Sequence, residues 1–113
     1  MSLAGQAKRV TIVVEEAEQW HHQQLATAIV ERIRAEGGAG ATVVRGIMGF
    51  GSHGAIHTAR LVELASNLPL VITWVDSDEA VSRILPIITP MISEGLITVE
   101  PVEVVLYHHR DKA

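Results

Sequence analysis

Glycines and polar side chains are concentrated in one stretch of this chain, and we expect its chemistry there. Four of the nine residues from Gly46 to Gly54 are glycine, a residue that lets backbone N–H groups come close to a ligand. Four side chains of types that can bind phosphate or other polar ligands lie in or just after this stretch: Ser52, His53, His57 and Thr58. About twenty residues separate Gly46 from Leu68, whereas adjacent antiparallel strands are usually joined by two to five. The length of this connection also indicates a functional loop.

His53 and His57 are four residues apart, the spacing that places two imidazoles on one face of a helix as metal ligands. The surrounding glycines disfavour a helix, and no third ligand stands nearby in the sequence. We therefore favour ordinary loop histidines and no metal, and we keep a metal site at His53 and His57 as the alternative. The adjacent pairs His21–His22 and His108–His109 send their side chains in different directions, so we expect them at the surface.

No catalytic group of residues is visible in the sequence. The serines lack the context of a nucleophile elbow, and residues 46–51 match neither a P-loop nor a dinucleotide fingerprint. The chain has no cysteine, which excludes disulfides, thiolate zinc sites and thiol nucleophiles. We therefore expect a binding protein, with no catalytic residues, and not an enzyme.

Length, charge and hydropathy narrow the class of protein further. A chain of 113 residues predicts a single domain over residues 1–113. Nine lysines and arginines, scattered along the chain, stand against thirteen acidic residues, so no basic face for nucleic acid is expected. Apolar runs are far shorter than the roughly 20 residues that span a bilayer, and the N-terminus carries no signal-peptide pattern. These features predict a cytoplasmic protein without direct membrane insertion.

The hydrophobic periodicity predicts the elements that must position the glycine-rich stretch. β-Branched and aliphatic runs predict four strands, and stripes at helical spacing predict two helices. Gly37, Gly38 and Gly40 end the first helix. Asp76 and Ser77 supply N-cap chemistry for the second helix, and Gly95 ends it. Pro86 and Pro90 should kink or shorten the second helix, and Pro101 indicates a sheet edge or a bulge. The predicted strands cover residues 7–16, 41–45, 68–75 and 96–107, and the helices cover 20–36 and 78–94.

The order strand, helix, strand, loop, strand, helix, strand predicts an α+β fold of the ferredoxin-like type, a βαββαβ sandwich. Two helices then cover one face of a four-stranded antiparallel sheet, with the first and third strands at its centre. Alternation in the third strand sends Ile72 and Trp74 to one face and Val71 and Val75 to the other. Because both faces are apolar, we predict a homo-oligomer packed through the face without helices. The alternative is a lone sheet with a mildly apolar outer face.

The central residues also carry a family likeness. Residues 40–51 (GATVVRGIMGFG), then Ile56-His57-Thr58, Leu68-Pro69 and Val75-Asp76-Ser77, resemble a PII-like family of uncharacterised proteins, domain of unknown function one-ninety. The likeness runs from about residue 10 to residue 107. It implies the ferredoxin-like PII fold, a homotrimer, and a T-loop-like segment at about residues 46–66 that docks on a partner protein.

In the wider PII superfamily, small ligands bind in clefts between subunits at the base of the T-loop. The resemblance therefore implies a signalling or regulatory trimer that binds a small, nucleotide-like or anionic ligand. The implied ligand-binding residues are Arg45, Gly46, Gly49, Phe50, Gly51, His57 and Thr58. The partner protein is unknown, with a membrane transporter or channel as a candidate, since some relatives are encoded beside fluoride-channel-type proteins.

One departure from the PII pattern bears on the cofactor. The glycine-rich, lysine-bearing loop that holds nucleotide phosphates in PII proteins has no counterpart in residues 93–98 (SEGLIT), and the T-loop tyrosine is missing. A nucleotide stays a candidate cofactor, but ATP binding in the PII manner is not expected.

Overall fold

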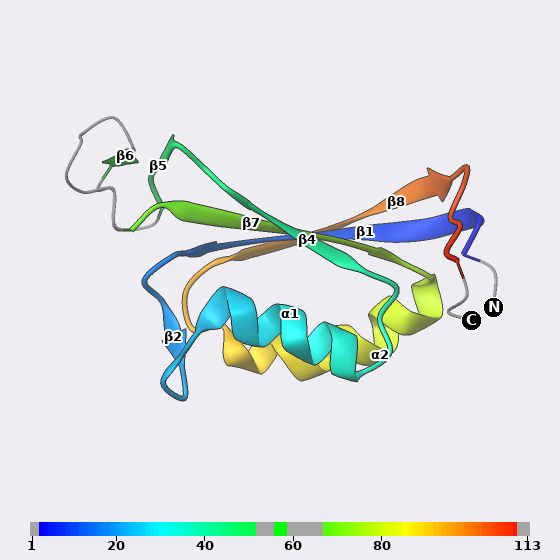
Figure 1. Ribbon diagram of the computed structural model, residues 1–113, viewed down its shortest axis with the longest axis horizontal. Helices are drawn as coiled ribbons and strands as arrows, with labels where there is room; N and C mark the ends of the chain where they lie inside the picture. The colour runs from blue at the N-terminus through cyan, green and yellow to red at the C-terminus, as the bar shows by residue number, and fades with distance from the viewer. Residues whose placement is uncertain (1–2, 52–55, 59–66, 111–113) are drawn as a thin grey trace.

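The β-branched run near the N-terminus forms β1 (Gly5–Glu15) at the centre of an antiparallel sheet in the computed structural model, which describes residues 3–51, 56–58 and 67–110. β1 pairs with β7 (Pro69–Asp76) on one side and with β8 (Leu96–Val104) on the other. β4 (Ala41–Arg45) lies beyond β7 at the opposite edge (Figure 1). The strand order β4-β7-β1-β8 confirms that the first and third predicted strands are central.

Two helices, α1 (Leu25–Ala35) and α2 (Asp78–Ile88), cover the same face of this sheet (Figure 1). Their apolar stripes meet the buried side chains of β1 and β7 in one core, centred on Ile12, Ile72 and Trp74. The predicted α+β, ferredoxin-like arrangement is confirmed. On β7 the residues alternate strictly between buried and half-buried, so the strand has one core face and one partly open face.

The first helix begins at Leu25 and not at residue 20 as predicted, because residues 19–24 form a small hairpin. β2 (Gln19–Trp20) pairs with β3 (Gln23–Gln24), and the turn between them holds His21 and His22 at positive φ angles of 49° and 67°. Trp20 and His21 stack with ring centroids 4.0 Å apart. The helical stripe of apolar residues begins only at Leu25, and that is where α1 begins.

Gly37 and Ser77 lie at the helix ends as predicted, whereas Asp76 has another role. Gly37 follows the C-terminal cap of α1 with φ +86°, a conformation that suits glycine. The Ser77 hydroxyl accepts a hydrogen bond from the Ala80 N–H at 3.1 Å and is the N-cap of α2. Asp76, predicted to share that role, is buried and instead accepts hydrogen bonds from the Ala39 N–H at 2.7 Å and the Trp74 indole at 2.9 Å. Its carboxylate therefore joins the chain after α1 to the end of β7.

Both prolines of the second helical segment lie inside helical structure. Pro86 is within α2, which continues to Ile88, and Pro90 is in a following 3₁₀ turn, η1 (Thr89–Met91). The predicted helix over residues 78–94 is therefore an eleven-residue α-helix plus this turn.

The last strand ends at Val104, three residues before the predicted end, because its partner runs out. Gly5, the first residue of β1, pairs with Val104, so no ladder is available to residues beyond it. Residues 105–110 have no regular structure, and the Tyr107 hydroxyl donates to the Ala39 carbonyl at 2.9 Å. Pro101 lies in β8 at the edge of the sheet, as predicted.

The glycine-rich connection contains more regular structure than predicted. β5 (Met48–Gly49) and β6 (His57–Thr58) form a two-residue ladder, in which Met48 pairs with Thr58 and Gly49 with His57. This ladder lies beyond the end of β4 and the start of β7, at the end of the sheet where β1 finishes (Figure 1).

Candidate functional site

A pocket of about 480 Å³ lies at the end of the sheet where β1 finishes and β8 begins. It is mostly apolar, with carboxylates at Glu15, Glu18 and Glu94. Its described lining comes from four parts of the chain: the end of β1, the stretch around β5, the start of β7 and the start of β8. The lining residues are Val13, Val14, Glu15, Glu18, Met48, Gly49, Phe50, Gly51, Pro69, Glu94, Gly95 and Leu96.

Three of the predicted ligand-binding residues, Gly49, Phe50 and Gly51, form one wall of this pocket. Phe50 is 72% exposed, so its ring is available to a ligand and contributes little to the core. Neither Arg45 nor Gly46 is among the lining residues. Of His57 and Thr58 the structure describes the backbone ladder with β5, and His53 lies outside the described residues.

Two of the glycines are needed for packing against Pro69. A Cβ atom on Gly46 would lie 2.8 Å from Pro69 Cγ, and one on Gly49 would lie 3.0 Å from the same atom. The Gly46 N–H also donates to the Pro69 carbonyl at 2.7 Å, so this N–H group is already engaged. These glycines therefore bring the chain after β4 against the start of β7, which places Phe50 and Gly51 at the pocket.

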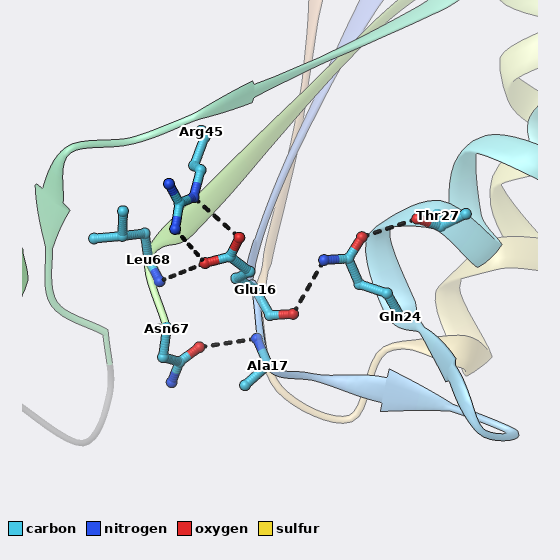
Figure 2. A network of polar contacts seen from close by, with 7 residues as sticks. All are labelled: Glu16, Ala17, Gln24, Thr27, Arg45, Asn67 and Leu68. Carbon is cyan, nitrogen blue, oxygen red and sulfur yellow. Dashed lines mark hydrogen bonds and ion pairs between the residues drawn. The ribbon is translucent and has the colours of Figure 1, made fainter. Parts of the chain in front are cut away.

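Glu16, directly after β1, holds the two ends of the connection between β4 and β7 (Figure 2). Its carboxylate accepts from both Arg45 Nε and Arg45 Nη2 at 3.0 Å, and from the Leu68 N–H at 3.4 Å. The Arg45 guanidinium, hydrogen-bonded to this carboxylate, is the main cause that lowers the pKa of Glu16 below 4.5. The Leu68 N–H acts in the same direction, and partial burial opposes both.

Further hydrogen bonds extend this network to the first helix (Figure 2) and to Glu15 in the pocket lining. Asn67 accepts from the Ala17 N–H through Oδ1 at 2.9 Å and donates to Glu15 Oε1 through Nδ2 at 2.9 Å. Gln24 donates to the Glu16 carbonyl at 3.3 Å and accepts from the Thr27 hydroxyl at 2.8 Å. The end of β1 and the residues that follow it, which bring Glu15 and Glu18 to the pocket, are thus hydrogen-bonded to residues 45, 67 and 68 and to the start of α1.

The sequence interpretation missed this network. A charged run such as residues 15–18 (EEAE) is typical of a solvated connection, and for Arg45 the family resemblance implied a role in ligand binding. The predicted topology contained a signal for the Glu16–Arg45 pair. In an antiparallel sheet of this strand order, the ends of the first and second strands and the start of the third lie at the same end of the sheet. Opposite charges at residues 16 and 45 therefore come together there.

Charge at the pocket constrains what it can bind. Within the described part of the chain, its lining has three glutamates and no lysine or arginine.

Among the described residues, no group of three or more histidines and acidic residues is arranged to hold a metal ion. In the described helices there is also none that is long and apolar enough to cross a membrane.

Two proteins of the UPF0166 group are similar to this chain in sequence. It is 36% identical to the UPF0166 protein of Aquifex aeolicus over 98 residues, which cover 87% of this chain and 92% of that protein. A UPF0166 protein of Methanocaldococcus jannaschii is 33% identical over 94 residues, which cover 82% of this chain and 86% of that protein.

Two solved structures that share this fold are PII-like proteins. CPII of Thiomonas intermedia, a nitrogen regulatory PII-like protein bound to ADP, AMP and bicarbonate, superimposes with a TM-score of 0.68 at 22% identity, over 88% of each chain. A protein of Thermus thermophilus described as PII-like and signaling superimposes with a TM-score of 0.63 at 28% identity, over 93% of this chain and 94% of that one. Residues 7–104 match the family DUF190, described as an uncharacterised ACR, and this chain belongs to that family of PII-like fold.

Proposed function

We propose that this chain is a cytoplasmic, PII-like regulatory homotrimer that binds a small ligand beside Gly49–Gly51 and signals by docking on a partner protein. In this proposal the chain binds its ligand and does not transform it. The observation that carries the proposal is the pocket of about 480 Å³ at the base of the connection between β4 and β7. Pockets of this size, mostly apolar with a few polar groups, are typical of small-molecule sites.

The ligand class follows from the relatives and from the pocket. CPII, which shares the fold, binds ADP, AMP and bicarbonate, so a nucleotide or a small anion is the first candidate here. An exposed phenylalanine at residue 50 supports stacking with a flat, uncharged ring. Glu18 in the lining repels a nearby phosphate, so positive charge from a second copy or from a divalent cation would favour an anionic ligand.

Assembly is supported by the sheet face opposite the helices. Val44 and Leu96 on that face are 57% and 58% exposed, and Val13 and Val71 between them are half-buried. Four aliphatic side chains in a row on a sheet face favour burial against another copy. Packing there would enclose the pocket, since Val13 and Leu96 belong to both the row and the pocket lining.

The T-loop-like segment at about residues 46–66 is the proposed docking element. Its described parts expose large apolar side chains: Ile47, Met48, Phe50 and Ile56. Exposed apolar groups of this kind are suited to a protein partner. A membrane transporter or channel stays the candidate partner that the family resemblance suggests.

Calorimetric titration tests the ligand half of the proposal. We expect at least one of AMP, ADP, ATP and bicarbonate, each measured with and without Mg²⁺, to bind the purified chain. Phe50→Ala should weaken that binding by about tenfold or more while changing stability by less than about 0.5 kcal/mol. Leu106→Ala is the matched control, because Leu106 is also exposed, at 66%, and lies outside the pocket. Equal binding by both variants, or no binding by the wild type, would contradict the proposed site.

A further inference from the structure

The Arg45 guanidinium and the Glu16 carboxylate form a bidentate pair at the pocket end of the sheet (Figure 2). Arg45 Nε donates to Glu16 Oε2 and Arg45 Nη2 donates to Glu16 Oε1, both at 3.0 Å. Two parallel N–H groups that meet two oxygens are the geometry in which arginine binds phosphate and carboxylate groups. The Glu16 carboxylate therefore occupies an edge of the guanidinium that suits an oxyanion.

This pair borders the pocket, although neither of its residues is in the lining. Glu16 directly follows Glu15, which lines the pocket. Arg45 directly precedes Gly46, whose N–H donates at 2.7 Å to the carbonyl of Pro69, another lining residue. The guanidinium is thus held beside a pocket whose described lining has no lysine or arginine.

The pair is open enough to water for another anion to displace it. The Arg45 side chain is 51% exposed and the Glu16 side chain is 24% exposed, and ion pairs with such an exposed partner are weak. The Arg45 guanidinium lowers the pKa of Glu16, so the carboxylate is charged at neutral pH and the pair is intact there. Exchange of this carboxylate for another anion leaves the charge of Arg45 paired.

We propose that Glu16 is an internal competitor of the ligand: it holds the Arg45 guanidinium, and an oxyanion in the pocket takes Arg45 over when it binds. This inference rests on the proposed ligand site and adds a source of positive charge within the same chain. The oxyanion is the phosphate of a nucleotide or bicarbonate. The exchange releases the end of β4 from Glu16, whereas the Leu68 N–H, 3.4 Å from the carboxylate, keeps its acceptor.

Calorimetric titration of Glu16→Gln at pH 7 tests the competition. The probes are AMP, ADP, ATP and bicarbonate, with uncharged adenosine for comparison. We expect the anions that bind the wild type to bind Glu16→Gln about three- to fivefold more tightly, because they no longer displace an ion pair. Adenosine should bind both chains equally, since it has no anionic group for the guanidinium. Thermal melts confirm that each variant is folded.

A double-mutant cycle separates competition for Arg45 from simple charge repulsion. Glu18→Gln is the matched control, because Glu18 lines the pocket and carries the same charge as Glu16. In the Arg45→Gln background, Glu16→Gln should tighten anion binding by less than about 1.5-fold, whereas Glu18→Gln keeps its full effect. Arg45→Lys keeps the charge but loses the planar fork, so it should weaken the anions about threefold or more and leave adenosine unchanged.

Two results would overturn the competition and leave the proposed ligand site in place. One is anion binding by the wild type that is unchanged in Glu16→Gln. The other is an equal gain from Glu16→Gln with and without Arg45, because Glu16 would then act through its charge alone. No heat with any of the four anions, in the wild type or in Glu16→Gln, would instead refute the proposed site itself.

Discussion

Replacing Glu16 by glutamine removes the charge that holds both ends of the connection between β4 and β7. Glu16→Gln keeps the shape of the side chain but removes its negative charge, and it replaces one of the two oxygens that accept from Arg45 at 3.0 Å by an NH2 donor. An exposed ion pair contributes about 0.2–1 kcal/mol, and Arg45 is half exposed here, at 51%. Because the Glu16 side chain is only 24% exposed and the contact is bidentate, we expect a loss of about 1 kcal/mol in the free energy of unfolding at pH 7.

The pH dependence of that loss identifies its cause. The pKa of Glu16 is lowered in the folded chain, so the carboxylate contributes stability above its ordinary pKa of 4.5 and loses it as pH falls through the folded value. The difference between wild type and Glu16→Gln should therefore be full at pH 7 and shrink below about pH 4.5. Urea unfolding at several pH values and one fixed protein concentration measures it.

Glu31→Gln is the matched control for this experiment. The Glu31 carboxylate is exposed on α1, on the side of the sheet away from the open face, and accepts from the neutral Gln23 amide at 2.8 Å, so we expect a smaller loss, below about 0.5 kcal/mol. A loss in Glu16→Gln that equals that of Glu31→Gln, or that stays constant from pH 7 to pH 3, would refute the proposed role of Glu16.

Three further changes have expected outcomes. Asp76→Asn cannot accept from every N–H group that the buried carboxylate serves, including the Trp74 indole, and should lower the free energy of unfolding by about 2–4 kcal/mol, measured in urea; a loss below about 1 kcal/mol would contradict this. His21→Asn/His22→Gly suits the two positive φ angles of the hairpin turn and should raise stability by about 1 kcal/mol, whereas a lower melting temperature would be unexpected. Glu18→Gln removes a carboxylate from the pocket and should tighten binding of an anionic ligand by about threefold in calorimetry; weaker binding would indicate a cationic ligand.

The fold was predictable because the strands carry strong local patterns. The aliphatic alternation around Ile12 and Ile72 identifies both central strands and their core faces, and Gly37 marks the end of the first helix. The predicted boundaries are wrong where strand pairing, and not the local pattern, decides where an element begins or ends. The hairpin at residues 19–24 has no apolar periodicity to reveal it, and β8 ends at Val104 only because β1 begins at Gly5.

The lining of the pocket was predictable in part. The resemblance directed attention to residues 49–51, and the structure has them on the pocket wall. Glu16 was missed because its role depends on Arg45 and Leu68, which are 29 and 52 residues away and meet it only at the end of the folded sheet. Glu15 and Glu18 of the pocket lining were missed because a run of charge at a strand end resembles a solvated turn.

Glycine amides give the most direct test of the central claim, that the pocket beside Gly49 binds the ligand. Their signals are separated in a two-dimensional ¹H–¹⁵N spectrum, and the glycines are well distributed over the molecule. On titration with the nucleotide or bicarbonate that shows heat in calorimetry, we expect the amides of Gly49, Gly51 and Gly95 to shift in a saturable manner. The amide of Gly37, at the end of α1 and outside the pocket lining, should stay in place. Shifts at Gly37 without shifts at the three pocket glycines would contradict the account.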